Sequence, residues 1–275
     1  MSIKPLGRKA YGSIPHLPNS RTGPADWSCH EGQDRICTVC RRDGKDTVVV
    51  QQKLDGSCCA VARVGDEIIA LGRAGFPSVT SPYIQHWMFA WWVKTQERRF
   101  LGFLKDGERV VGEWLAQAHG TRYNLPHEPF VVFDIMVEAE RKPFLEVMAR
   151  CAWGGDTGRP FVMPQLISYG PAVSTAGAMQ RLSARTHGAN DNIEGVVYRV
   201  ERDGKVDFLA KYVDHDKVDG AYLPEISGAS APAWNRYLGT RLNEMFDLPR
   251  ITDWAQEQAA QYTQQGETTT DGSDL

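Results

Sequence analysis

Turn residues placed between short apolar runs limit most strongly how this chain can fold. The clearest case is Asp203-Gly204, which separates apolar runs at 195–201 and 205–213. An Asp-Gly step between two such runs is a strong hairpin signal. The turn Gly65-Asp66 separates a second pair of runs in the same way. Because a hairpin joins antiparallel neighbours, and parallel strands need a long crossover, the pattern predicts largely antiparallel sheets.

Helices are predicted between these hairpins, which makes the fold class α+β. Tyr83, Trp87 and Trp91 recur at spacings of four, which predicts a helix over 83–103 whose aromatic stripe packs in the core. Further helices are predicted over 142–151, 174–186 and 233–246, and further strands over 47–50, 109–116, 130–137 and 161–167. Residues 1–46, rich in Gly, Pro and Ser, are expected to wrap the same domain as loops.

Charge divides unevenly along the 275 residues. The whole chain has 31 basic and 34 acidic residues, for a net charge of −3. The stretch 253–275 has five acidic residues and no Lys or Arg, so residues 1–252 carry 31 basic against 29 acidic. This near-neutral body neither supports nor excludes a nucleic-acid partner. The stretch is expected to be an acidic tail that is disordered beyond Gly266.

Apolar runs are too short for a membrane span, and the first residues lack the apolar region of a secretory signal. A cytoplasmic location is therefore expected, with the six cysteines mostly as free thiols. Cys29, His30, Cys37 and Cys40 offer donors that zinc accepts, but the adjacent Cys29 and His30 rarely reach one metal together. Free thiols are the favoured interpretation, with structural zinc as the alternative.

The segment Lys53-Leu54-Asp55-Gly56 carries the first chemical signal. A lysine amine acts as a nucleophile only when its pKa is lowered by positive charge, metal or burial. The acid two residues later could orient the amine, and the glycine lets the backbone approach a phosphate. Such a segment could equally be a surface turn, so the segment alone is a weak signal.

Five further segments follow in order and end or lie within predicted strands. They are Gly72-Arg73-Ala74-Gly75, Val111-Gly112-Glu113-Trp114, Phe133-Asp134, Glu194-Gly195-Val196-Val197-Tyr198 and Phe208-Leu209-Ala210-Lys211-Tyr212. Together they supply a nucleophile, carboxylates for a divalent cation, cations for a triphosphate and an aromatic face for a base. These are the parts that phosphoryl-type transfer requires.

In this order the six segments resemble motifs I, Ia, III, IIIa, IV and V of the covalent nucleotidyltransferases, which include ATP-dependent DNA ligases, RNA ligases and mRNA capping enzymes. Pro15-His16-Leu17 and Ser20-Arg21 look closest to bacterial and phage RNA ligases. The resemblance implies a DNA/RNA ligase adenylation-domain fold, ATP-grasp-like, with antiparallel sheets around a nucleotide cleft. It implies a core at 47–213, a short helical appendage at 214–252 and no OB-fold.

The resemblance also implies a role for each matched residue. Lys53 would attack the α-phosphorus of ATP and hold AMP, with Asp55 helping to position it. Lys211 would meet the α-phosphate, and Glu194 would hold a catalytic Mg²⁺ or Mn²⁺. The other implied ATP contacts are Arg73 to the ribose side or the incoming 5′-phosphate, Glu113 to the ribose and Phe133 to adenine.

One departure concerns motif V, which usually offers Lys-x-Lys but has Lys211 alone here. Either Lys211 serves both purposes, or Lys217 or Lys205 substitutes. The resemblance predicts an ATP-dependent RNA ligase that joins 5′-phosphate and 3′-OH ends, with no obligate protein partner. DNA ends, a capping-type reaction or a catalytically lapsed nucleotide- or RNA-binding module are the alternatives.

Overall fold

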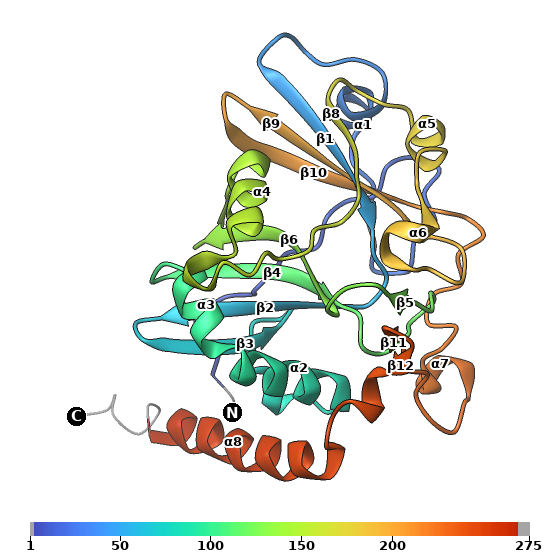
Figure 1. Cartoon of the computed structure of the whole chain (residues 1–275). Coiled ribbons are helices and arrows are strands. Elements are labelled where there is room, and N and C mark those ends of the chain that lie inside the picture. The colour runs from blue at the N-terminus through green and yellow to red at the C-terminus, as the bar shows by residue number, and fades with distance from the viewer. Residues whose placement is uncertain (1–2, 269–275) are drawn as a thin grey trace.

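The computed structural model describes residues 3–268, and most of their strands form two antiparallel sheets, one above the other in Figure 1. The four-stranded sheet has the order β10-β9-β1-β8, with β1 (Asp46–Lys53), β8 (Leu166–Gly170), β9 (Gly195–Arg202) and β10 (Lys205–Val213). The five-stranded sheet has the order β3-β2-β4-β6-β7, with β2 (Ser57–Val64), β3 (Glu67–Gly72), β4 (Glu108–Trp114), β6 (Phe130–Val137) and β7 (Glu140–Arg141). The predicted α+β class with antiparallel sheets is confirmed.

The hairpin signals form the turns that the sequence predicts. β9 and β10 pair in antiparallel register, with Arg202 opposite Lys205. Asp203 and Gly204 both have positive φ, at 50° and 74°, which is the backbone that a tight two-residue hairpin turn requires. β2 and β3 pair around Gly65-Asp66 in the same manner.

Helices cover the outer faces of the two sheets. The five-stranded sheet packs against α2 (Ile84–Thr95), α3 (Glu97–Phe103) and α4 (Phe144–Trp153) around an aromatic core that includes Phe89, Trp114 and Phe130. The four-stranded sheet packs against α1 (Glu31–Thr38) and α5 (Thr175–Met179). Because each sheet has its own covered face, the opposite faces are left to form a site between the sheets.

Several predicted elements differ from the structure. The helix expected over 83–103 divides at Gln96 into α2 and α3, and the one expected over 174–186 is two short helices, α5 and α6 (Ala184–His187). The strand expected over 161–167 begins only at Leu166. The loops expected over 1–46 contain α1, where His30 accepts a hydrogen bond from Gln33 N at the helix start. That capping interaction explains why a polar segment forms a helix.

The chain after β10 was predicted least well. The helix expected over 233–246 is absent; these residues form β11 (Arg236–Tyr237), β12 (Thr240–Arg241) and a short 3-10 helix, η3 (Leu242–Glu244). β11 and β12 build a small sheet with β5 (Asn124–Leu125), and α7 (Pro224–Ser227) precedes them. The described residues 214–268 therefore form no five-stranded barrel.

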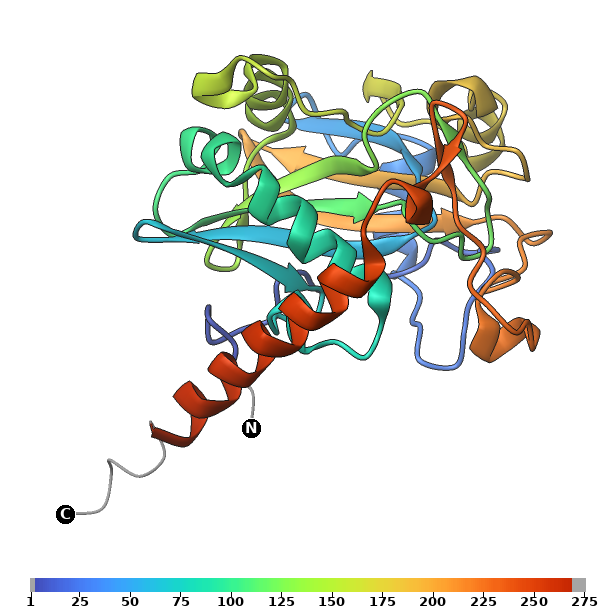
Figure 2. The same ribbon diagram turned by 60° about the horizontal axis from the view of Figure 1, so that its bottom comes forward.

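The long helix α8 (Leu248–Thr268) crosses the boundary at which the acidic tail was expected to begin. It lies along α2 (Figure 2). Trp254 packs edge-on against Trp91, with ring centroids 5.1 Å apart. Two members of the aromatic stripe, Trp87 and Trp91, thus pack as predicted, whereas Tyr83 is 49% exposed. The expected disorder lies mostly outside the described residues. No described helix has the length and apolar character needed to cross a membrane.

Candidate active site

The segment Lys53-Leu54-Asp55-Gly56 joins the two sheets. β1 belongs to the four-stranded sheet and β2 to the five-stranded sheet, so the chain passes from one to the other within Leu54, Asp55 and Gly56. A Cβ at Gly56 would lie 2.6 Å from Trp114 O, closer than real Cβ contacts allow. Glycine is therefore needed for the close crossing, and the crossing leaves Lys53 where the two sheets meet.

Strand register brings three of the motifs side by side. Lys53 lies opposite Gly195 across the β1–β9 pair, and Gly195 lies opposite Val213 across the β9–β10 pair. A Cβ at Gly195 would overlap Tyr212 O, so only glycine allows the strands to approach this closely after Glu194. Residues some 140 to 160 positions apart in sequence thus become neighbours through ladder hydrogen bonds.

A cavity of about 260 Å³ lies between the sheets. Its walls come from both sheets and from the N-terminal segment, and they include five of the seven residues that the resemblance singled out: Lys53, Arg73, Glu113, Phe133 and Lys211. Glu194 is not part of the wall but forms an ion pair with Lys53, which is. Asp55 lies on the crossing itself. The structure therefore gathers the candidate residues around one cavity.

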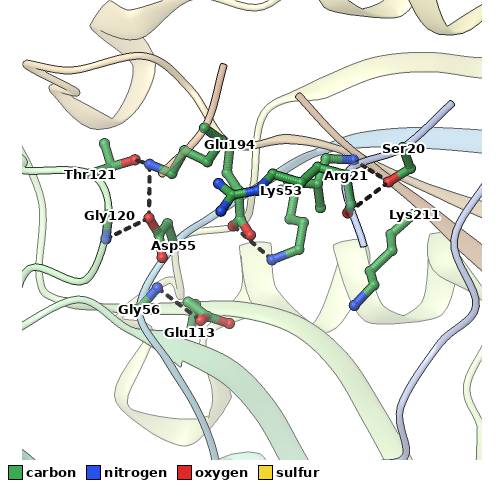
Figure 3. A network of polar contacts seen from close by, with 12 residues as sticks. Ser20, Arg21, Lys53, Asp55, Gly56, Glu113, Gly120, Thr121, Glu194 and Lys211 are labelled. Atoms are coloured by element: carbon green, nitrogen blue, oxygen red, sulfur yellow. Dashed lines mark hydrogen bonds and ion pairs between the residues drawn. The ribbon is translucent and has the colours of Figure 1, made fainter. Parts of the chain in front are cut away.

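Lys53 is held by a carboxylate. Its Nζ lies 2.7 Å from Glu194 Oε2 (Figure 3), and the two side chains are 22% and 9% exposed. Burial lowers the pKa of Lys53, but the negative charges of Glu194, Glu113 and Asp55 outweigh burial and raise it above its ordinary value. In this arrangement the amine is protonated. A lysine in this state needs a change in its electrostatic environment before it can act as a nucleophile.

The other two carboxylates, of Glu113 and Asp55, each link the crossing to another segment of the chain. Glu113 Oε1 accepts a hydrogen bond from Gly56 N at 3.0 Å. Asp55 Oδ2 accepts one from Gly120 N at 2.9 Å and forms an ion pair with Lys217 Nζ at 2.8 Å. Figure 3 shows the Asp55 carboxylate turned toward Gly120, away from the Lys53 amine. Asp55 thus acts on Lys53 through its charge and by fixing the crossing.

These carboxylates fit a hard divalent cation. Burial, together with the charges of Glu194 and Asp55, raises the pKa of Glu113 to about 8, and burial also raises the pKa of Glu194. Raised pKa values show that negative charge is concentrated where water is scarce, which a cation would relieve. Among residues 3–268 no group of three acidic, His or Cys side chains forms a ready-made metal cage. Mg²⁺ commonly binds through one or two carboxylates and completes its shell with water and phosphate, which this donor set permits.

The basic residues near motif V have different positions. Lys211 lines the cavity, and its Nζ lies 3.4 Å from Asp26 Oδ1. Lys217 is only 3% exposed, and its amine contacts Asp55 and Thr121. Lys205 lies six residues from Lys211 along β10, about 20 Å away in a strand. Lys205 is therefore too distant to replace the missing lysine, and Lys217 is engaged with Asp55.

The other end of the cavity is aromatic. Phe133 lines it beside Tyr11, whose ring packs edge-on at 5.3 Å. Asp134 is fully buried beneath them and bonds to Tyr11 Oη at 3.1 Å and to Arg199 at 2.8 Å. Because Asp134 is on β6 and Arg199 on β9, this ion pair ties the two sheets together behind the aromatic end of the cavity.

Two glutamines that precede the lysine were not predicted to belong to the site. Gln51 and Gln52 are 7% and 2% exposed. Side chains alternate along β1, so Gln51 lies on the cavity face with Lys53, whereas Gln52 lies on the face of Val48 and Val50, which pack in the core of the four-stranded sheet. The amide nitrogen of Gln51 has no hydrogen-bond partner among the described residues, so it is available to a molecule in the cavity. Polar residues within an otherwise apolar strand were the available signal.

The cysteine-rich region has another arrangement. Cys37 is buried in the core of the four-stranded sheet, Cys40 is exposed, and all six cysteines are free thiols. His30 caps α1. His119, to which the sequence assigned no role, lies in a polar network with Gln85 and Ser57 next to the crossing.

Comparison with known proteins places the chain in a family. The RNA ligase family model matches residues 46–213, more than half of the chain. The chain therefore belongs to the RNA ligase family. No curated protein matches it in sequence.

Solved RNA ligases of Naegleria gruberi share the fold. A lysine-to-alanine mutant with ATP and Mn has a TM-score of 0.53 at 19% identity, covering 83% of this chain and 61% of that one. The enzyme with PPi has a TM-score of 0.50 at 21% identity, covering 81% and 63%. An apo mutant has a TM-score of 0.51 at 20% identity, covering 83% and 64%. The chain thus spans about three fifths of the length of these ligases.

Proposed function

We propose that this protein is an ATP-dependent RNA ligase that forms a lysyl-AMP intermediate at Lys53. The observation that carries the proposal is the position of the Lys53 amine, at the crossing between the sheets and in the wall of a nucleotide-sized cavity. Membership of the RNA ligase family supports the reaction type. Complexes of the similar solved ligases with ATP and Mn, and with PPi, support the nucleotide and the cation.

Three displacements at phosphorus make up the reaction. The Lys53 ammonium ion first gives a proton to solvent. Its Nζ then forms a bond to the α-phosphorus of ATP while the bond to pyrophosphate breaks, and a second proton leaves the nitrogen for solvent to give the phosphoramidate. A polynucleotide 5′-phosphate then takes the AMP from Lys53. Finally, the 3′-OH of a second end attacks the adenylated 5′ end, and AMP leaves. Lys211, on the cavity wall, stabilises the charge of the transferring phosphate.

Different residues around the cavity contact the base, the ribose and the phosphates of ATP. Phe133 stacks on adenine, and the Gln51 amide, on the same face of β1 as Lys53, bonds to the N6 amino group and an adjacent ring nitrogen, as glutamine amides do with adenine. Glu113 contacts the ribose. Arg73, exposed at the cavity mouth with Nη2 2.6 Å from Ser13 Oγ, contacts the ribose side or the incoming 5′-phosphate.

Glu194, with Glu113 nearby, would hold Mg²⁺ or Mn²⁺, which supplies positive charge against the carboxylates and the phosphates. Glu194 keeps Lys53 protonated through a 2.7 Å ion pair. Neutralising Glu194 removes the largest charge that raises the pKa of Lys53. A cation held by Glu194 would therefore make the Lys53 amine easier to deprotonate.

The test is covalent labelling. The protein is incubated with Mg²⁺ and ATP labelled on the α-phosphate, and a denaturing gel is expected to show a labelled band. Lys53→Ala should abolish the band, whereas Lys205→Ala, a matched lysine at the far end of β10, should retain it. A band that survives Lys53→Ala contradicts the assignment. Competition between nicked RNA and nicked DNA then identifies the polynucleotide.

A further inference from the structure

The N-terminal segment 15–27 extends the four-stranded sheet beside Lys211. β10 is the edge strand of that sheet. Leu17 N donates to Lys211 O at 2.7 Å, Lys211 N donates to Pro15 O at 2.9 Å, and Arg21 N donates to Val213 O at 3.0 Å. The segment therefore covers the end of β10 that carries the single lysine of motif V.

Side chains of this segment form a relay of close polar contacts from the backbone of β10 to the Lys211 amine. Val213 N donates to Ser20 Oγ at 2.9 Å, and Ser20 Oγ lies 2.6 Å from His16 Nδ1. His16 Nε2 lies 3.2 Å from Asp26 Oδ2, a close contact without the angle of a hydrogen bond, and Asp26 Oδ1 lies 3.4 Å from Lys211 Nζ. The His16 ring therefore limits where the Asp26 carboxylate can lie.

Burial gives the relay a fixed geometry. His16 is 2% exposed, so its ring cannot reorient without leaving the core. Asp26 Oδ2 also accepts a hydrogen bond from Gly23 N at 2.9 Å, which fixes the carboxylate from a second direction. The Lys211 side chain is 16% exposed and lines the cavity. A flexible lysine is thereby given one preferred position, which favours catalysis because less motion must be lost at the transition state.

We propose that Asp26, oriented by His16, is a positioning residue that holds Lys211 at the α-phosphate site. The inference rests on the proposed function. It accounts for how one lysine can act where Lys-x-Lys is usual: the segment 15–27 restricts the amine that remains. Asp26 itself contacts Lys211 and not the reacting atoms.

The charges around Lys211 supply a second reason for Asp26. The groups that face its amine are Asp26 and His16 on the segment, Lys53 on β1 and Glu194 before β9. Burial and the charge of Lys53 lower the pKa of Lys211, whereas Asp26 raises it. Removing the Asp26 charge should therefore make Lys211 lose its proton at a lower pH. The alkaline decline in adenylation rate should move to lower pH in the same variant.

The test measures single-turnover formation of lysyl-AMP at saturating ATP. Asp26→Asn should slow the rate constant roughly 10- to 100-fold, the effect expected when a catalytic group is misplaced. The KM for ATP should not rise, because a negative charge near the triphosphate has been removed. Asp26→Glu keeps the charge and should restore part of the rate. Asp203→Asn, at the exposed β9–β10 turn, is the matched control and should behave as wild type.

The amplitude and the rate constant of lysyl-AMP formation distinguish a positioning role of Asp26 from a role in folding. If Asp26→Asn lowers only the amplitude, which reports the fraction of competent protein, Asp26 has a structural role and the inference is wrong. An unchanged rate constant and pH profile would overturn it as well. His16→Asn should slow the rate in the same direction, and its effect should not add fully to that of Asp26→Asn. A wild-type protein that forms no adduct at Lys53 would instead refute the proposed function on which the inference rests.

Discussion

Replacing Gln51 by leucine should weaken ATP binding and leave the ligand-free fold at least as stable. The Gln51 side chain is 7% exposed and lines the cavity on the same face of β1 as Lys53, and its amide nitrogen has no partner among the described residues. Two hydrogen bonds to adenine, at about 0.5–1.5 kcal/mol each, amount to about 1–3 kcal/mol. That loss corresponds to a Kd for ATP about 5- to 150-fold higher.

The same substitution should raise the free energy of unfolding of the ligand-free protein. A buried polar group without a partner costs about 1–3 kcal/mol, and leucine of similar size removes that cost. In a domain of this size a gain of 1 kcal/mol raises Tm by about 2–4 °C. An ordinary core residue would behave differently, since its replacement lowers stability.

The assay is calorimetric titration with ATP in a Lys53→Ala background, where the nucleotide is not consumed, together with thermal unfolding of the ligand-free protein. Gln256→Leu, an exposed glutamine on α8, is the control and should leave both quantities unchanged. Wild-type affinity for ATP in Gln51→Leu would refute the assignment to adenine. Loss of several kcal/mol of stability would show that the amide is satisfied within the protein.

Three further perturbations follow from the same geometry. Phe133→Leu should raise the Kd for ATP about fivefold, measured by titration, because a stacked ring contributes about 1 kcal/mol, whereas Phe133→Tyr should bind normally. Lys217→Met should lower the free energy of unfolding in urea by about 3–5 kcal/mol, because it leaves Asp55 without its buried partner at 2.8 Å. Burial, and the proximity of His127, lower the pKa of His187 to about 3, so the unfolded chain takes up this proton first as pH falls. Urea titrations should show about 2 kcal/mol of stability lost from this group between pH 7 and pH 5, and His187→Gln should remove that part of the pH dependence.

The sequence by itself determined the local elements with strong turn or strand signals. Asp203-Gly204 between two apolar runs was enough for the β9–β10 hairpin, because positive φ at both residues leaves few other structures. The segment Lys53–Gly56 and the ordered motifs were enough for the family. Where the signal was weak, as in 233–246, the prediction failed: short strands there depend on pairing with β5, which lies more than one hundred residues away.

Only the tertiary structure decided how the candidate residues are combined. Register across β1, β9 and β10 places Lys53 beside Glu194, and no local pattern encodes that register. The unpaired amide nitrogen of Gln51 and the relay from His16 to Lys211 are likewise invisible in sequence, because burial and partners are properties of the packed molecule. The residue types determine which chemistry is available. Long-range packing determines which of those residues meet, because contacts between distant segments form only when the two sheets assemble.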